Sequence, residues 1–243
     1  MGKLNLNRDI ENYLNKKKIV EDGLYTLYQK LNLKNYPRKI ECFDISNIQG
    51  KDAVASMSVA VEGRPYKRAY RKFKITCKDT PDDFAMMREV ITRRYSKLDK
   101  KDFPDVILID GGLGQINAVG HILEKIGKNN IADLLSLAKR DEEIYKYGEE
   151  SPYSFPKEWE ALKIFQRVRD EAHRFGITYH RKLRSKRVVS SELDKILGIG
   201  EKRKNILFKE FGSVKKILEQ DVETLSKFVP KNVAERILEI LKK

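Results

Sequence analysis

The chain starts with apolar side chains at helical spacing and then changes to extended, strand-like runs. Residues 8–33 carry their apolar positions on a highly charged background, which predicts a helix. Three strand-like runs follow, at residues 39–46, 53–61 and 66–75. The short, turn-forming segment at residues 62–65 predicts that the second and third runs pair as an antiparallel hairpin.

From residue 80 onward the pattern alternates between helix and strand. A helix start is predicted by a threonine N-cap, a proline at the first position and two carboxylates in the first turn: Thr80, Pro81, Asp82 and Asp83. Further elements are predicted at 105–110 (strand), 113–126 (helix), 131–139 (strand) and 157–180 (helix). Three antiparallel strands followed by alternating helices and strands predict an α/β fold of the ribonuclease H-like type, a mixed sheet with flanking helices.

The pattern changes after a basic stretch at residues 181–187, beyond which only short helices are predicted. Glycines mark the turns of this last part, and an amphipathic helix ends it. We therefore expect a helical lead-in at 1–36, a ribonuclease H-like domain at 37–187 and a small all-α domain at 188–243.

The net charge of the chain limits the classes of partner that it is expected to bind. Fifty Lys and Arg residues against 36 Asp and Glu give a formal charge of +14, which favours nucleic acid or an anionic surface. No apolar run approaches the roughly 20 residues of a membrane-spanning helix, and no signal peptide is visible. Cys42 and Cys77 are too few for a disulfide framework and lack metal-binding spacing. We expect a cytoplasmic protein that binds DNA and no membrane.

Two carboxylates, Asp44 and Asp110, each end an apolar segment that is typical of a buried strand. Carboxylates in such places cap a helix, meet a cation or do chemistry. A helix cap alone would explain Asp110 about as well, whereas no P-loop motif exists and Asn117 stands where a dinucleotide fingerprint needs glycine. In a ribonuclease H-like sheet the two strands are neighbours, so the carboxylates would repel each other unless Mg²⁺ or Mn²⁺ neutralised them. Such an ion can activate water against a phosphodiester.

His173 is the candidate third member of this site. It lies on the polar flank of the helix predicted at 157–180, next to the apolar side chains that are expected to pack in the core. A solvated, basic helix face is the commoner explanation of such a flank. Asp82 and Asp83 are sufficiently explained as helix-start charges, and a further role in the metal site stays open. The alternating row Tyr66, Arg68, Tyr70, Lys72 and Lys74 fits a DNA-facing strand and a solvated edge strand equally well.

The segment LGIGEKRK has the pattern of a helix-hairpin-helix turn. Two glycines let the backbone approach closely, so that amide groups at a helix N-terminus can bind a phosphate without reading bases. The predicted DNA-binding residues are Gly198, Gly200, Lys202, Arg203 and Lys204. A tight helical turn with no ligand is the alternative.

Five motifs in order, IECFDISNIQG, PDDFAMMREVITRRY, LIDGGLGQ, RDEAHRFGITYHRK and LGIGEKRK, resemble the C-terminal half of the UvrC family, the nuclease subunits of bacterial nucleotide excision repair. The resemblance implies an Asp-Asp-His nuclease site, made of Asp44, Asp110 and His173, that incises DNA on the 5′ side of a lesion. It also implies lesion-bearing or junction DNA as substrate, the UvrB helicase subunit as partner and UvrA as an indirect one. An acidic position of the family matches Asp82 or Asp83.

The sequence departs from this family in two places. The second hairpin, expected near KFVPKNVAERI, has Pro230 and Asn232 instead of a G-h-G turn. The GIY…YIG nuclease, cysteine-rich and helicase-binding segments of the family are not found, so at most one incision is expected. A non-catalytic DNA-binding scaffold is the rival hypothesis, and a phosphatase acting on small substrates would leave the basic surface unused.

Overall fold

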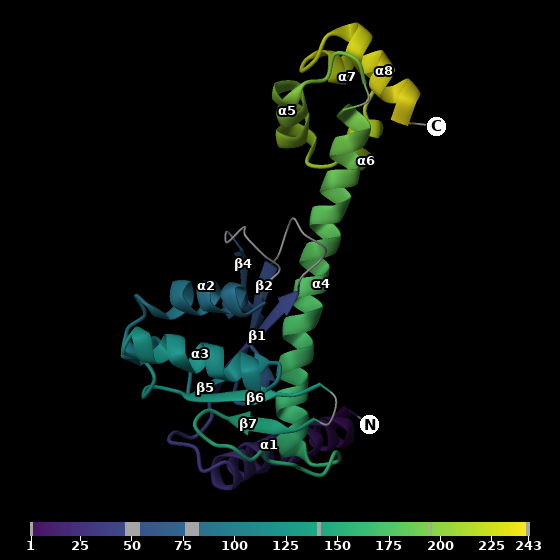
Figure 1. Cartoon of the computed structure of the whole chain (residues 1–243). Coiled ribbons are helices and arrows are strands. Elements are labelled where there is room, and N and C mark those ends of the chain that lie inside the picture. The colour runs from purple at the N-terminus through teal and green to yellow at the C-terminus, as the bar shows by residue number, and fades with distance from the viewer. Residues whose placement is uncertain (1, 47–53, 76–82, 140–141, 195, 242–243) are drawn as a thin grey trace. The chain divides into compact units, whose positions relative to one another are not determined.

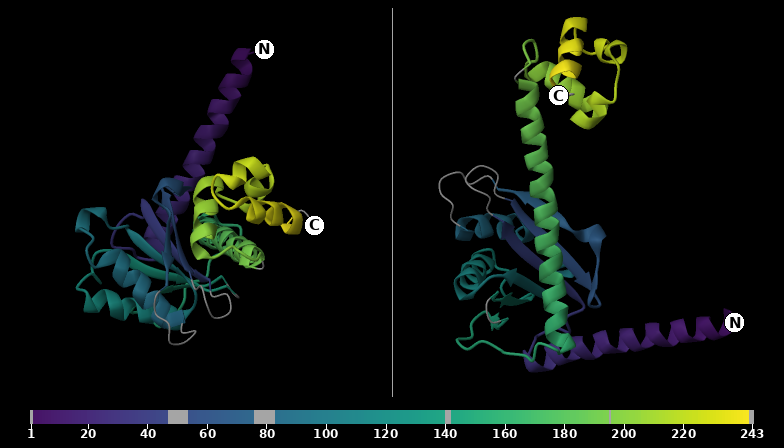
Figure 2. Two further views of the ribbon diagram at one scale, coloured as in Figure 1. Left: turned by 90° about the horizontal axis from the view of Figure 1, so that it is seen from above. Right: turned by 90° about the vertical axis from the view of Figure 1, so that its right-hand side faces the viewer.

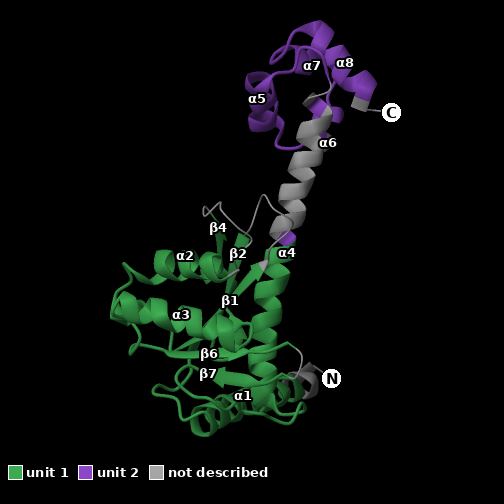
Figure 3. Ribbon diagram, viewed as in Figure 1, with its two compact units in different colours: residues 1–177 green, residues 178–243 purple. Residues whose placement is uncertain are grey.

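The computed structural model describes residues 2–46, 54–75, 83–139, 142–194 and 196–241. It has two compact units, residues 1–177 and 178–243 (Figure 3). The division falls inside helix α4 (Glu160–Asp194), and the predicted domain limits 1–36, 37–187 and 188–243 stay a prediction. Among the described residues no helix combines the length and the apolar character needed to cross a membrane.

The first unit is built on one mixed sheet of seven strands (Figure 1). Its strands are β1 (Lys39–Ser46), β2 (Val54–Val61), β3 (Arg64–Pro65), β4 (Arg71–Lys74), β5 (Val106–Asp110), β6 (Asp133–Leu137) and β7 (Ile144–Lys146). The order is β3-β2-β1-β5-β6-β7, and β4 also pairs with β2. The parallel pairs β1–β5 and β5–β6 lie between antiparallel ones. The predicted ribonuclease H-like mixed sheet is therefore confirmed.

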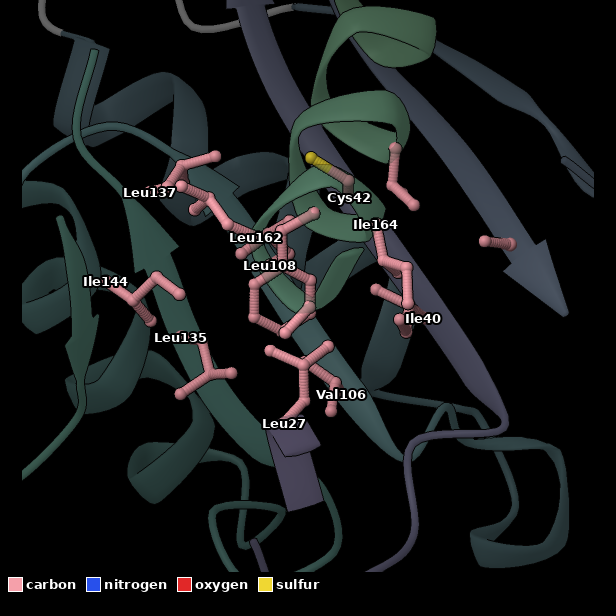
Figure 4. Close-up of a cluster of buried hydrophobic side chains, with 14 of the residues drawn as sticks. Leu27, Ile40, Cys42, Val106, Leu108, Leu135, Leu137, Ile144, Leu162 and Ile164 are labelled. Carbon is pink, nitrogen blue, oxygen red and sulfur yellow. The ribbon is translucent and has the colours of Figure 1, made fainter. Parts of the chain in front are cut away.

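Helices cover both faces of this sheet. Helices α2 (Asp83–Tyr95) and α3 (Leu113–Lys125) pack on one face, where the core includes Phe43, Ile107 and Ile109. Helix α4 and the C-terminal part of α1 (Gly2–Lys30) cover the other face (Figure 4). That core includes Cys42 and Leu108, which alternate with the first set along β1 and β5, as the two-residue period of a strand requires. The N-terminal part of α1 extends away from the sheet (Figure 2).

The hairpin after β2 forms as predicted, but the run at 66–75 is not one strand. Glu62 and Gly63 have φ values of 51° and 67°, the left-handed pair that a tight hairpin turn needs. After β3 the chain makes a 3₁₀ turn at Lys67–Ala69 before β4 begins. Tyr70 is turned inward, with its hydroxyl donating to Glu171, so the predicted alternating row does not share one face. Pro65 has no amide to continue the ladder, and the strand ends there.

One further prediction needs correction, and one strand was missed. The predicted helix at 157–180 is α4, which continues to Asp194, because the basic stretch 181–187 consists largely of good helix formers. The short strand β7 was not predicted, since three residues give no usable period.

The second unit is all helical, as predicted. After the end of α4 it contains α5 (Glu201–Phe211), α6 (Val214–Leu218), α7 (Val222–Ser226) and α8 (Lys231–Leu241). Its core is separate and includes Ile196, Leu207, Leu225, Val233 and Ile237.

Candidate active site

Asp44 and Asp110 are placed side by side by the parallel pairing of β1 with β5. The register runs from Ile40 opposite Val106 to Phe43 opposite Ile109, so the next residue of each strand is one of the two carboxylates. Both follow the alternation of Cys42 and Leu108 and therefore face α4. They are 2% and 5% exposed. The prediction that these strands are neighbours is confirmed.

His173 reaches the carboxylates from α4. Its Nδ1 atom lies 3.2 Å from Oδ2 of Asp44, and 51% of its side chain is exposed. From the residues alone a solvated basic face was the favoured explanation of this flank, and contact with the sheet was the alternative; the structure brings His173 to Asp44. One ligand atom from each of Asp44, Asp110 and His173 can be chosen so that all three lie within 4.8 Å of one another.

Two buried serines hold α4 against the sheet and were missed by sequence reasoning. The hydroxyl of Ser56 donates to the carbonyl oxygen of Ala172 at 2.7 Å, and that of Ser58 donates to the carbonyl of Val168 at 2.6 Å. Ser56 is the cross-strand partner of Asp44, and Ala172 precedes His173. The helix is thus fixed to the sheet at the point where the histidine meets the aspartate. Hydroxyls at alternate positions of the apolar run AVASMSVAV were the available signal.

Asp110 has the electrostatics of a site made for a cation. Burial raises the pKa of its carboxyl, Lys139 acts in the opposite direction, and the negative charge of Asp44 raises it further. Among the described groups neither carboxylate oxygen has a hydrogen-bond partner. It forms an ion pair with Lys139, whose Nζ lies 3.3 Å from Oδ2. Because buried charges require pairing or a metal, these residues fit a divalent ion bound by carboxylates.

The side chains of the other two acidic candidates lie outside the part of the chain that the structure describes. Asp82 lies outside the described residues, as do Thr80 and Pro81. Asp83 is the first residue of α2, and its side chain is not among those described. A role for either acidic residue stays a prediction.

The GIG turn of the second unit requires its first glycine. Gly198 has a φ of +100°, and a Cβ added there would lie 2.9 Å from a methyl carbon of Val233. Gly200 is the N-cap of α5 in extended conformation. Lys202 is exposed.

Arg203 and Lys204 make contacts inside the hairpin that the sequence did not predict. Arg203 donates to the carbonyl oxygen of Gly198 at 2.6 Å, and the buried Lys204 pairs with Glu201 at 2.9 Å. Both side chains therefore stabilise the turn and its helix. Contact of these residues with DNA stays a prediction.

Fold and site together define the class: a ribonuclease H-like nuclease domain followed by a helix-hairpin-helix module. Residues 28–177 match the family model of the UvrC RNase H endonuclease domain, and residues 190–243 match that of the SAM-like helix-hairpin-helix tandem. The chain belongs to the UvrC family.

Curated relatives agree with this assignment. "UvrABC system protein C" of Fusobacterium nucleatum is 65% identical over 234 residues, which cover 96% of this chain and 40% of the relative. The protein of the same name from Chlorobaculum tepidum is 46% identical over 217 residues, covering 88% of this chain and 34% of the relative. The chain thus spans about two fifths or less of the length of these relatives.

Solved structures with a distant likeness include endonucleases. One is an Endonuclease V from Bacillus subtilis. The match covers 71% of this chain and 94% of the Endonuclease V chain, with 13% sequence identity and a TM-score of 0.36. A likeness at this level carries no argument about function.

Proposed function

We propose that this chain is a divalent-metal-dependent DNA endonuclease of nucleotide excision repair that cuts on the 5′ side of a lesion. The observation that carries the proposal is the group of Asp44, Asp110 and His173, with ligand atoms within 4.8 Å of one another at the ends of neighbouring strands. Membership of the UvrC family supports the reaction class.

Asp44, Asp110 and His173 would have different roles in the hydrolysis. Asp44 and Asp110 would hold Mg²⁺ or Mn²⁺. When bound, such an ion would act as a Lewis acid and lower the pKa of a water molecule bound to it. The oxygen of water forms a bond to phosphorus, and the bond from phosphorus to O3′ breaks. Water loses a proton and O3′ gains one, so the products are a 5′-phosphate and a 3′-hydroxyl.

His173 is suited to handle the proton of the attacking water. In the orientation of the structure its Nδ1 faces Asp44, so a hydrogen on Nδ1 would leave Nε2 as the basic nitrogen. Asp44 then fixes both the ring orientation and the tautomer. Direct coordination of the ion by His173 is the other role that this position allows.

Duplex or junction DNA containing a lesion is the proposed substrate, with the UvrB helicase subunit as the partner that delivers it in the cytoplasm and UvrA acting indirectly. The formal charge of +14 supports a polyanionic partner. The GIG hairpin offers backbone amides at the start of α5, with Gly198, Gly200 and Lys202 at its surface.

The test is incision of a lesion-bearing duplex that is already nicked on the 3′ side, in the presence of UvrB and Mn²⁺. The parent chain is compared with Asp44→Asn and with Asp9→Asn, a matched acid-to-amide change on the exposed surface of α1. We expect a 5′ cut by the parent and by Asp9→Asn, and none by Asp44→Asn. A cut retained in Asp44→Asn would refute the site. Salt-sensitive DNA binding with no cut by any of the three would favour the non-catalytic scaffold.

A further inference from the structure

A hairpin beside the carboxylates brings in a cation that neither the family resemblance nor the sequence motifs had assigned. The amide of Ala138 donates to the carbonyl of Glu143 at 2.9 Å and closes the connection from β6 to β7. Lys139 lies on this connection, two residues beyond the end of β6, and its Nζ atom lies 3.3 Å from Oδ2 of Asp110. Its side chain is 64% exposed, whereas that of Asp110 is 1% exposed. The ammonium group therefore reaches the buried carboxylate from the solvent side.

The same hairpin is fastened to α4 one helical turn before His173. Arg169 donates through Nη1 to both carboxylate oxygens of Glu142, at 3.0 and 2.9 Å. Its remaining donors meet Asp170, and only 14% of the side chain is exposed. Glu142 has a φ of 56°, a conformation that is unfavourable for a non-glycine residue and persists where surrounding contacts impose it. The Arg169–Glu142 pair thus fastens the chain to α4 three residues after Lys139.

We propose that Lys139 is a further substrate-binding residue, whose ammonium group contacts a non-bridging oxygen of the scissile phosphodiester, and that the Arg169–Glu142 pair positions it. The inference rests on the proposed nuclease function. A divalent ion on Asp110 would compete with the ammonium group for Oδ2, because two cations cannot share one oxygen without repulsion. The anion that the substrate then brings to this place is a phosphate, which a compact ammonium charge binds well.

A competing role for Lys139 is simple neutralisation of Asp110 in the absence of metal. The two roles differ in what its removal does. If Lys139 only neutralises Asp110, its loss strengthens Mn²⁺ binding and leaves the cutting step unchanged. If it binds the phosphate, its loss slows cutting even when Mn²⁺ saturates the site.

The experiment measures two quantities for each variant: Mn²⁺ affinity by electron paramagnetic resonance without DNA, and the single-turnover incision rate at saturating Mn²⁺ and UvrB. For Lys139→Gln we expect Mn²⁺ binding equal to or tighter than that of the parent. We expect its incision to be slower by about 10²-fold, the usual loss for one donor to a developing charge. Lys139→Arg should recover most of the rate. Lys163→Gln, an exposed lysine elsewhere on α4, serves as the matched control and should match the parent.

The positioning role has its own variant, Glu142→Gln, which keeps Lys139 but weakens its support. We expect a loss of about tenfold in rate, and no additional loss when it is combined with Lys139→Gln, since residues acting through one another are non-additive.

Equal rates for the parent and Lys139→Gln would overturn the assignment of Lys139 and leave the nuclease intact. A loss in Lys139→Gln that more Mn²⁺ restores would overturn it as well. A parent chain that binds Mn²⁺ but never cuts would overturn the proposed function together with this inference.

Discussion

Two buried carboxylates on opposite faces of one sheet differ in how many partners their oxygens have. Glu41, on the α2 face of β1, is fully buried, and both of its oxygens are occupied by Arg94 at 2.7 and 3.1 Å. The Tyr95 hydroxyl adds a bond of 2.8 Å, and Lys39 lies 3.3 Å away. Asp110, on the α4 face of β5, has an ion pair with Lys139 but no hydrogen-bond partner among the described groups.

The difference teaches that burial of a carboxylate does not mark function by itself. A buried charge whose oxygens are all paired within the protein is structural, and its partners leave no room for a ligand. A buried charge with unfilled acceptor positions destabilises the fold unless something outside the chain fills them. Asp110 meets the second description and Glu41 the first.

The largest effect is expected from Asp110→Asn. We expect single-turnover incision to fall by about 10³-fold or more, equivalent to roughly 4 kcal/mol of barrier, because the amide no longer attracts the ion. Thermal unfolding should stay at the temperature of the parent or rise, since the charge that is removed is buried and its ion-pair partner, Lys139, is mostly exposed. Incision within tenfold of the parent would contradict this, and Asp9→Asn is again the matched control.

Glu41→Gln should have the opposite profile. It breaks a buried ion pair and leaves the Arg94 charge without its partner, so we expect the free energy of unfolding to fall by about 3 kcal/mol. Urea unfolding measures this loss, with the exposed Glu158→Gln as control. A loss below about 1 kcal/mol, the size of an ordinary hydrogen bond, would show that the network is not the stabilising device inferred here.

Addition of Mn²⁺ sharpens the same contrast without DNA. An ion at a concentration of 100 times its Kd stabilises the folded state by about 2.7 kcal/mol if it binds only that state. The midpoint of thermal unfolding should therefore rise in the parent and in Glu41→Gln, but stay unchanged in Asp110→Asn. Equal shifts in all three proteins would place the ion elsewhere.

The smallest effects are expected from the serines under α4. Ser56→Ala and Ser58→Ala each remove one buried hydrogen bond and should each lower the free energy of unfolding by about 1 kcal/mol. Only Ser56→Ala should also slow incision, because Ser56 bonds the carbonyl of the residue before His173. Equal incision rates for the two variants would show that the hydroxyl of Ser56 does not position the histidine.

The parts of the site that follow from local pattern were predictable from the sequence. Asp44 and Asp110 end apolar runs, and strand order in this fold makes those runs neighbours, so their approach needs no knowledge of side-chain packing. From the sequence, His173 could be recognised only as a polar position on the flank of a helix. Its contact with Asp44 joins residues that are 129 positions apart, which no local pattern records.

Other parts depended on packing that no short pattern records. Lys139 ends an apolar run in phase with Leu135 and Leu137, yet its role depends on a hairpin whose second strand has only three residues. Tyr70 was misplaced because the 3₁₀ turn after Pro65 shifts the phase of the strand. Arg203 and Lys204 are basic like Lys202, and only the structure shows that Arg203 bonds the carbonyl of Gly198 and that Lys204 is buried beside Glu201.

The serine bonds that join β2 to α4 have a consequence for the newly made chain. The three candidate metal ligands are spaced along the sequence at residues 44, 110 and 173, and the histidine is the last to be synthesised. A chain that has not yet made α4 lacks His173 and cannot complete the ligand set. Because domains fold as units during synthesis, a complete ligand set requires a finished, docked domain. If the proposed nuclease function holds, a chain whose synthesis stops before α4 would lack the complete site.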